Sequence, residues 1–416
     1  MDYIFKLFLS YSVEISIILT YLLKLIFKRL REFVFFKKKD ESKLRKNIQN
    51  IDLLVFKSGT MGDHLICIDS LDKLSSVDIS INKKIVCKEK SIFKDILDFS
   101  SHNNVELVSY KSLLRYFFFN IFRNKVTLIV DTEPNFRIGL LFGLIMPRCF
   151  ISSNYKAPYD NFLRNFDSII KLNLYDENLQ EGLYINNLIN NCINLFLSRY
   201  SGINLRTIND IEFKNKFLTP NWSNIDLSSL ELHDKFLEKI NLKQRKLIYL
   251  YYGCSGKAMH RLPSIYWMKK FEELLIDKFF ICYVGGPSEL QLKNIMKVSK
   301  FSSFEFINRF SISEWSLILS KSKYKLPLLS FDGGFSHIFG IHSSLIFQVF
   351  CSSNNKKWRN KSDLSFVYSC LDGGSPNYKP FKFKVPEECL ISKEAWSRSN
   401  VIDVFHKFDT WVENIK

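Results

Sequence analysis

Short apolar runs alternate with longer amphipathic stretches along most of this chain, starting near residue 51. In the first half, the apolar runs predict β-strands at 51–56, 83–88, 105–110 and 126–132. The amphipathic stretches between and after them predict helices at 63–74 and 139–146. Such alternation is typical of a parallel sheet with helices on both faces. The pattern therefore predicts an α/β fold.

The alternation is interrupted by a polar segment and then begins again. The second half predicts strands at 246–253, 279–286, 304–309, 326–331 and 345–350. It predicts helices at 227–240, 264–278, 288–298, 312–322 and 401–414. We therefore expect two Rossmann-like, doubly wound units that face a cleft, divided as 1–48, 49–240, 241–400 and a closing helix at 401–416. Ligands of such sheets bind beyond the carboxyl ends of the strands.

The charge balance narrows the possible partners. The chain has 59 Lys and Arg against 42 Asp and Glu, a formal net charge of +17, which suits a phosphate-rich partner. It has no RGG, RNP or zinc-finger pattern, which argues against nucleic acid. Nine cysteines without a C-x-x-C pair argue against a disulfide framework or a structural zinc site. They favour reduced thiols in a cytosolic compartment.

The first 48 residues differ from the rest. Residues 7–27 are mostly apolar, and about 20 apolar residues suffice to span a bilayer. Glu14 would cost about 2.5–3.5 kcal/mol near the bilayer centre. Polar side chains also recur every four residues, at Ser12, Ser16, Thr20 and Lys24. This pattern favours a helix lying in the membrane interface, with an ordinary core helix as the alternative.

A cluster of cationic and aromatic side chains follows the apolar run. Its cationic members are Lys28, Arg29, Arg31, Lys37, Lys38 and Lys39. Each contributes about 1 kcal/mol to binding an anionic membrane surface. We therefore expect residues 1–39 to hold the protein at the cytoplasmic face of a membrane. A cleaved signal peptide is not expected, because the basic residues follow the apolar run and no A-x-A site is present.

The first candidate site is the segment VFKSGTMGDHL at 55–65, which begins at the end of a predicted strand. Lys57 and Ser58 open a loop with two glycines, which permit close approach to a ligand. Asp63 stands at the start of the next helix, where its carboxylate could act as a general base. Asp is also a preferred helix N-cap, which is the alternative role for Asp63.

The second candidate site is the glycine-containing segment YYGCSGKAMHRLP at 251–263. It offers a hydroxyl group and potential cations to a ligand, from Ser255, Lys257, His260 and Arg261. These groups suit a diphosphate. The segment is not a Walker A loop, because Ala258 stands where Ser or Thr would bind magnesium. A solvated basic loop before a helix is the alternative.

The third candidate site is YVGGPSE at 283–289, another strand end with Glu289 just inside the next helix. A carboxylate at this position accepts hydrogen bonds from the ribose hydroxyls of a nucleotide in other α/β proteins. The alternative is an acidic residue that is favoured by the helix dipole alone.

The fourth candidate site is LLSFDGGFSHIFGIH at 328–342. Asp332, Gly333 and Gly334 follow a strand, and backbone N–H groups at a helix entrance bind phosphate. His337, three residues farther on, could donate a hydrogen bond to a leaving diphosphate.

In this order, the four segments resemble the heptosyltransferase-like glycosyltransferases of family 9, which have the GT-B fold. Five segments carry the resemblance: MGD at 61–63, HRLP at 260–263 (K-R-x-P in the family), GGPSE at 285–289 (G-G-x-x-E), DGGFSH at 332–337 (D-[SG]-G-x-x-H) and VDTEPNFRIGLL at 130–141 (D-x-x-x-x-x-[RS], ending at Arg137). Trp358 also resembles a family position. The resemblance covers the chain from about residue 51 to its end.

The resemblance implies an inverting transferase that moves heptose or a related sugar from a nucleotide-diphosphate donor, with no essential metal or other cofactor. It implies an N-terminal acceptor domain and a C-terminal donor domain. The acceptor would be a lipid-linked glycan of the lipopolysaccharide type, at the cytoplasmic face of the bacterial inner membrane. Asp63 would deprotonate the acceptor hydroxyl, and Glu289 would bind the nucleoside. The implied acceptor contacts are Lys57, Ser58 and Arg137, and the implied diphosphate contacts are Ser255, Lys257, His260, Arg261, Asp332, Gly333, Gly334 and His337.

The chain departs from the family pattern at three places. His260 stands where Lys is usual, Gly333 replaces a frequent Ser or Thr, and residues 1–48 extend the family core. Two other functions therefore remain open. One is a non-catalytic nucleotide- or glycan-binding scaffold at the membrane. The other is a nucleotide-dependent hydrolase, for which the only support is the loop around Lys257.

Overall fold

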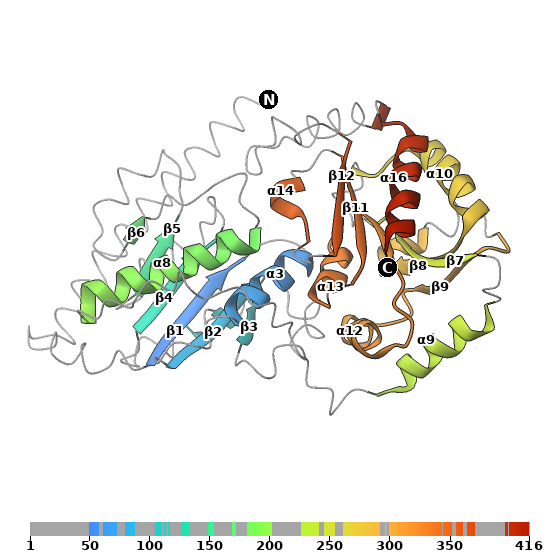
Figure 1. The fold of residues 1–416 in the computed structure, drawn as a ribbon. Helices are drawn as coiled ribbons and strands as arrows, with labels where there is room; N and C mark the ends of the chain where they lie inside the picture. Colours follow the sequence, from blue (N-terminus) through green and yellow to red (C-terminus); the bar gives the residue numbers. More distant parts are fainter. Residues whose placement is uncertain are drawn as a thin grey trace, which may run out of the picture.

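The computed structural model contains two six-stranded parallel sheets (Figure 1). It describes residues 50–57, 61–72, 80–87, 105–109, 112–113, 115–116, 126–132, 149–153, 169–171, 181–201, 226–240, 245–253, 261–291, 296, 299–342, 344–351, 355–360, 364–370, 396–397 and 399–415. The predicted membrane-associated segment, 1–48, and the predicted helix at 139–146 lie outside these residues. Among the helices that are described, none combines the length and apolarity needed to cross a bilayer.

The first unit is built on a sheet with the strand order β3-β2-β1-β4-β5-β6. Its strands are β1 (Asn50–Phe56), β2 (Ser80–Cys87), β3 (Val105–Ser109), β4 (Val126–Asp131), β5 (Cys149–Ser153) and β6 (Ile169–Lys171). β1 pairs with β2 and β4, and residues 51–56 are all buried, as expected for a parallel strand covered on both faces. Helices α3 (Met61–Asp72) and α8 (Glu181–Ser201) pack against each other beside this sheet.

The second unit is built on a sheet with the order β12-β11-β10-β7-β8-β9. Its strands are β7 (Lys246–Tyr251), β8 (Phe279–Gly285), β9 (Ser302–Ile307), β10 (Leu328–Phe331), β11 (Ile346–Phe350) and β12 (Ser365–Ser369). Its helices are α9 (Ser228–Lys239), α10 (Ile265–Lys278), η8 (Pro287–Gln291, a 3₁₀ helix), α12 (Ile312–Lys321), α13 (Phe335–Ile341), α14 (Asn355–Trp358) and α16 (Val401–Asn414).

Alternate side chains of β7 face two different apolar clusters. Ile248 and Leu250 pack with residues of α10 and α16, whereas Tyr249 and Tyr251 pack with residues of α12 and α13. Successive side chains of a strand point to opposite faces, so helices must cover both sides of this sheet. Figure 1 shows α16 and α10 close together, away from α12 and α13.

Three helices of the second unit, α10, α12 and α16, begin at side-chain caps. Ser264 accepts a hydrogen bond from the Trp267 N–H at the start of α10, at 3.2 Å. Ser311 and Glu314 form a capping box at the start of α12. Asn400 caps α16. A cap of this kind is worth about 0.5–2 kcal/mol and explains why these helices begin where they do.

The two units meet through α3 of the first and α13 of the second, which pack against each other. One buried apolar cluster contains residues of both units, including Leu65 of α3 and Ile338 of α13. Helix α3, which follows β1, is therefore placed beside α13, which follows β10.

Most of the predicted elements that fall on described residues are confirmed. The predicted helix at 401–414 coincides with α16, and the predicted strands correspond to β1–β4 and β7–β11. The predicted helix at 288–298 begins as the 3₁₀ helix η8, Pro287–Gln291. The Glu289 carboxylate bonds back to the Gly286 N–H there and tightens the turn. The proposed divisions at residues 48, 240 and 400 stay predictions.

Five of the described elements were not foreseen: β5, β6, α8, α14 and β12. Helix α8 is the longest of them, and five asparagines lower its helix propensity. Its buried residues nonetheless recur at helical spacing: Tyr184, Ile185, Leu188, Ile189, Cys192, Ile193 and Phe196. Packing of this apolar face on α3 compensates for the weak propensity.

Candidate functional site

The strand order of the second sheet reverses between β7 and β10. From β7 the chain continues to β8 and β9 on one side, and it then returns to β10, β11 and β12 on the other side. In open α/β sheets, ligands bind outside the carboxyl ends of the strands at such a switch point. The loops that follow β7 and β10 are therefore the first place to look for a site.

Two glycines bring these loops into direct contact. A Cβ atom added to Gly333, after β10, would lie only 2.2 Å from the carbonyl oxygen of Gly253, after β7. A Cβ atom on Gly253 would lie 2.0 Å from Cε2 of Tyr251, whose buried ring fills the adjacent space. Only glycine permits backbone segments to approach this closely. Tyr251 is a residue of this site that no sequence motif marks.

An ion pair joins the same two loops. Arg261 Nη1 lies 3.2 Å from Asp332 Oδ2, and the two side chains are 27% and 16% exposed. The Arg261 carbonyl oxygen accepts a hydrogen bond from Trp396 Nε1 at 2.9 Å, which anchors its backbone to the C-terminal part of the chain. Both predicted residues thus lie at the switch point, and the partly exposed guanidinium is available to an anionic ligand.

A chain of buried hydrogen bonds supports the loop after β10. Ser336 donates to the Gly333 carbonyl oxygen at 2.8 Å and accepts from Gln348 Nε2 at 3.2 Å. Gln348 in turn accepts from the Asn360 N–H at 2.8 Å. Gln348 is a polar residue within the apolar strand LIFQVF, and that exception was the signal in the sequence for this network.

His337 lies in the first turn of α13, as the sequence predicted. Its N–H donates to the Gly334 carbonyl oxygen at 3.2 Å, and its side chain is half-buried. Gly334 is the N-cap residue of α13. Asp332, Gly333, Gly334 and His337 therefore form one continuous structure between β10 and α13.

Glu289 forms the edge of the site beyond β8. Its side chain is buried, and Oε2 accepts a hydrogen bond from the Gly286 N–H at 2.7 Å. Gly285 has a φ of +150°, and a Cβ atom there would lie 2.7 Å from Glu289 Cγ. The positive φ and the missing side chain of Gly285 let the carboxylate fold back over the end of β8.

The first unit contributes Lys57, directly after β1, at the corresponding switch point between β1 and β4. Lys57 Nζ donates to Glu181 Oε1 at 2.8 Å, and both side chains are only 3% exposed. Lys57 Nζ also lies 5.9 Å from the centre of the Trp358 ring, which belongs to the second unit. The ion pair lies within the first unit, and the cation–π contact connects the two units beside their shared apolar cluster. Glu181 was not foreseen, because its role depends on a partner 124 residues away.

Asp63 is the third residue of α3, the helix that packs against α13. The backbone positions that carry Asp63 and His337 are therefore on two helices in contact. Five predicted site residues lie outside the described part of the chain: Ser58, Arg137, Ser255, Lys257 and His260. Their roles stay predictions.

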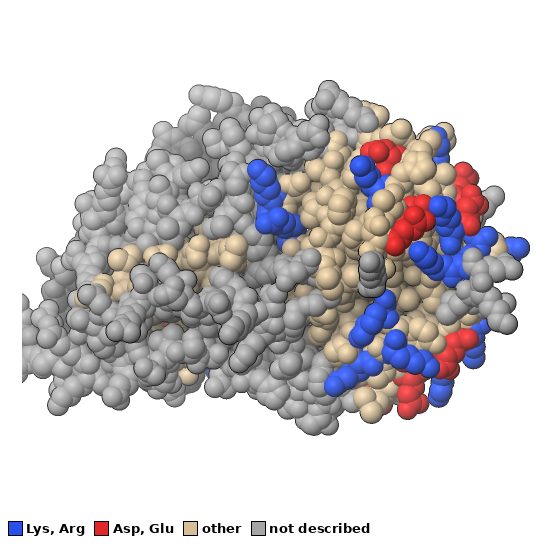
Figure 2. Space-filling view, in the orientation of Figure 1, with Lys and Arg blue, Asp and Glu red and all other residues tan. Residues whose placement is uncertain are grey.

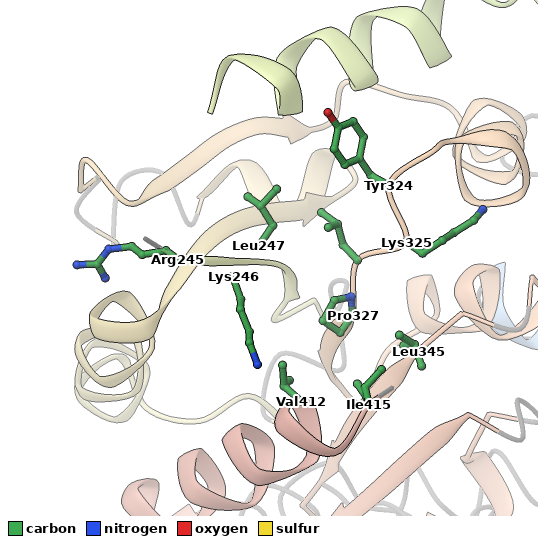
Figure 3. Close-up of a pocket in the computed structure, with 10 residues that line it drawn as sticks. Arg245, Lys246, Leu247, Tyr324, Lys325, Pro327, Leu345, Val412 and Ile415 are labelled. Atoms are coloured by element: carbon green, nitrogen blue, oxygen red, sulfur yellow. The ribbon is translucent and has the colours of Figure 1, made fainter. Parts of the chain in front are cut away.

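A separate cavity of about 380 Å³ lies at the opposite, amino-terminal edge of the second sheet. Its lining includes Lys246, Lys325 and Val412 (Figure 3). Figure 3 shows its cationic side chains pointing in different directions. Lys325 Nζ is bound to the Leu319 carbonyl oxygen at 2.7 Å, and the guanidinium of Arg245 stacks 3.4 Å from the centre of the Phe301 ring. These cationic side chains therefore do not point toward one common position.

The charges on the described face of the second unit are mixed in sign. Figure 2 shows Lys and Arg interspersed with Asp and Glu there. Ion pairs join several of them, including Lys323 with Glu238 and Lys278 with Asp409. Within the described ranges, no group of His, Cys, Asp and Glu is arranged to hold a metal ion. The expectation that no metal is essential stays a prediction.

No family model matches the sequence, and no curated protein matches it either. Solved structures do match the fold. A family 9 glycosyl transferase from Veillonella parvula DSM 2008 is 12% identical, with a TM-score of 0.56 over 86% of this chain and 96% of that one. The ADP-heptose LPS heptosyltransferase II of E. coli is 11% identical, with a TM-score of 0.51 over 83% of this chain and 99% of that one. The resemblance to family 9 is thus confirmed at the level of the fold: this chain has the α/β fold, with two parallel sheets, of these glycosyltransferases.

Proposed function

We propose that this protein is an inverting glycosyltransferase that uses a nucleotide-diphosphate sugar. The observation that carries the proposal is the convergence of three elements at the carboxyl edge of the second sheet. These are the Arg261–Asp332 pair, the Gly333–Gly334 loop and the folded-back Glu289. A cation and a glycine loop can bind a diphosphate, and a carboxylate held in place can bind the hydroxyls of a ribose. The fold shared with family 9 supports the same assignment.

In this proposal the donor lies along the ends of β7, β8 and β10. Glu289 accepts hydrogen bonds from the ribose hydroxyls, and the Gly286 N–H keeps its carboxylate oriented. Arg261 neutralises charge on the departing diphosphate, together with backbone N–H groups near Gly334 and with His337. Asp332 orients the Arg261 guanidinium. Ser255, Lys257 and His260 complete this surface.

The acceptor lies on the side of the first unit. Asp63 takes the proton from the acceptor hydroxyl as its oxygen attacks the anomeric carbon, and the nucleoside diphosphate leaves. The packing of α3 on α13 supports this role, because it places the helix with Asp63 beside the helix that follows the donor loop. Ser58 and Arg137 contact the acceptor. Lys57 acts through its ion pair with Glu181, which fixes the end of β1.

We also propose that residues 1–39 hold the enzyme on an anionic membrane surface, at the cytoplasmic face of the bacterial inner membrane. This location suits a lipid-linked envelope glycan of the lipopolysaccharide type as acceptor. The six cationic residues after the apolar run support it, at about 1 kcal/mol each. Flotation with phosphatidylglycerol vesicles tests it. A variant with these six residues changed to Gln should lose binding, and retention of full binding would refute it.

Calorimetric titration with ADP, UDP, GDP and CMP tests the donor site. We expect one nucleotide to bind, and Glu289→Gln to weaken its binding by roughly tenfold, equivalent to about 1.4 kcal/mol. Glu305→Gln is the matched control, because Glu305 is an exposed carboxylate on the neighbouring strand β9. If no nucleotide binds, or if both variants behave alike, the donor site is elsewhere.

Transfer assays with sugars of the preferred nucleotide then test the chemistry. Asp63→Asn should bind the donor normally and lose turnover, since it keeps the shape of the side chain but cannot accept a proton. Full turnover by this variant would remove Asp63 as the base. Nucleotide binding without turnover on any acceptor would instead favour the non-catalytic scaffold.

A further inference from the structure

Two cysteines lie side by side at the carboxyl ends of β11 and β12. The parallel register pairs Phe350 of β11 with Ser369 of β12. Cys351 and Cys370 are the residues that directly follow this pair on the two strands. The Cys370 N–H donates to the Phe350 carbonyl oxygen at 2.8 Å, which continues the ladder to this point. Both cysteines are thiols in the structure.

The spacing of neighbouring strands falls within the range that a disulfide can bridge. Neighbouring strands lie about 4.7–4.9 Å apart, and disulfides join residues whose Cα atoms are about 4.4–6.8 Å apart. Cys351 and Cys370 each follow one member of the in-register pair Phe350 and Ser369, so the alternation of side chains along both strands places the two on the same face of the sheet. A bond between them therefore needs only a small adjustment of the backbone.

The two thiols differ in exposure. Cys351 is 3% exposed, whereas Cys370 is partly exposed. The hydrogen bond with Cys370, burial and the nearby carboxylate of Asp332 all raise the pKa of the Cys351 thiol. The thiolate is the attacking species, so Cys370 is the better placed of the two to react first with a molecule from solvent.

We propose that Cys351 and Cys370 form a reversible disulfide by exchange with a small-molecule disulfide such as oxidised glutathione. The Cys370 thiolate attacks one sulfur of that disulfide, forms a mixed disulfide and releases one thiolate, which takes up a proton. Cys351 then loses its proton, attacks the sulfur of Cys370 and expels the second thiolate. Two protein thiols and one small disulfide thus become one protein disulfide and two small thiols.

The bond would tie the edge strand β12 to its only partner within the described sheet, β11. It would also form near Asp332, whose negative charge helps to raise the pKa of the Cys351 thiol and whose carboxylate pairs with Arg261. The dithiol chemistry itself does not depend on the proposed transferase function.

Equilibration of the full-length protein with mixtures of reduced and oxidised glutathione tests the proposal. Acid quenching, alkylation of the remaining thiols and peptide mapping then identify each linkage. We expect a peptide cross-link between Cys351 and Cys370 that rises with oxidised glutathione and disappears with excess reduced glutathione. Thermal unfolding of each variant confirms that it is folded.

The variants separate the two steps. Cys351→Ser should retain Cys370 as a stable mixed disulfide with glutathione, and Cys370→Ser should leave Cys351 unmodified. Cys282→Ala is the matched control, because Cys282 is fully buried in β8, and it should form the cross-link as the parent does. The proposal is overturned if Cys370 accumulates as the mixed disulfide in the parent protein. It is equally overturned if either cysteine pairs mainly with a different one.

Discussion

Replacing Gly333 with alanine tests whether the contact between the two glycine loops holds the candidate site together. The added Cβ atom would lie 2.2 Å from the Gly253 carbonyl oxygen and 2.8 Å from Tyr251 Cε1. Cβ contacts below 3.0 Å are essentially never observed, so the loops must separate by roughly 0.8 Å. The obstacle is a backbone atom and a buried ring, so no rotation of a flexible side chain relieves it. Overpacking of this kind costs about 1–3 kcal/mol.

We expect Gly333→Ala to lower the free energy of unfolding by about that amount and to weaken nucleotide binding by roughly tenfold. Binding suffers because Asp332 and its partner Arg261 move with the loop. Urea unfolding followed by tryptophan fluorescence measures the stability of the second unit, since five of the six tryptophans lie at or after residue 267.

Gly286→Ala is the matched control for stability. It also follows a strand of the second sheet, but its added Cβ atom would lie 3.7 Å from the nearest atom, Glu289 Oε2. Its free energy of unfolding should stay within about 0.5 kcal/mol of the parent. The reasoning is refuted if Gly333→Ala is as stable as the parent, or if both alanine variants are destabilised equally.

Three further changes probe other parts of the molecule. Glu181→Ala should lower the free energy of unfolding in urea by about 3–5 kcal/mol, because it leaves the Lys57 ammonium buried without this carboxylate. A double variant, Lys57→Met with Glu181→Leu, should recover most of the lost free energy. Burial, followed by nearby positive charge, lowers the pKa of His342 from 6.5 to about 4. The unfolded chain therefore binds a proton at His342 more readily than the folded protein does. The contribution of His342 to the free energy of unfolding should be complete above pH 6.5 and fall by up to about 3 kcal/mol toward pH 4. The variant His342→Gln should not show this loss. Gln348→Leu should cost about 1–3 kcal/mol and speed hydrogen exchange at the Asn360 amide, which loses its acceptor; unchanged exchange would contradict the network.

The sequence revealed those elements whose apolar runs or amphipathic faces were strong in themselves. β1, β7 and α16 were predicted closely for this reason. Helix α8 was missed because its asparagines obscured an apolar face that only packing on α3 makes evident. A local sequence pattern reveals helix propensity and the spacing of apolar residues. It does not reveal the packing partner whose contact overrides a weak propensity.

The candidate site likewise contains residues that the sequence predicted and residues that it did not. Glu289, Asp332 and Gly333 were predicted because each follows a strand, and the topology of a parallel sheet brings strand ends together. Glu181, Tyr251 and Asn360 were not predicted, because each acquires its role from a contact with a residue of another loop or element. Their chemistry is ordinary, so no residue type or spacing could have marked them.

The apolar packing of α3 on α13 bears on how this protein can move. Domains joined by a polar interface open and close as nearly independent bodies, whereas a buried apolar interface resists separation. Here one apolar cluster belongs to both units, so wide opening would expose it to water. We therefore expect the units to rock about this pair of helices, which would act as a pivot. A ligand bound at the loop before α13 would then affect the start of α3 directly, through the contact between the two helices.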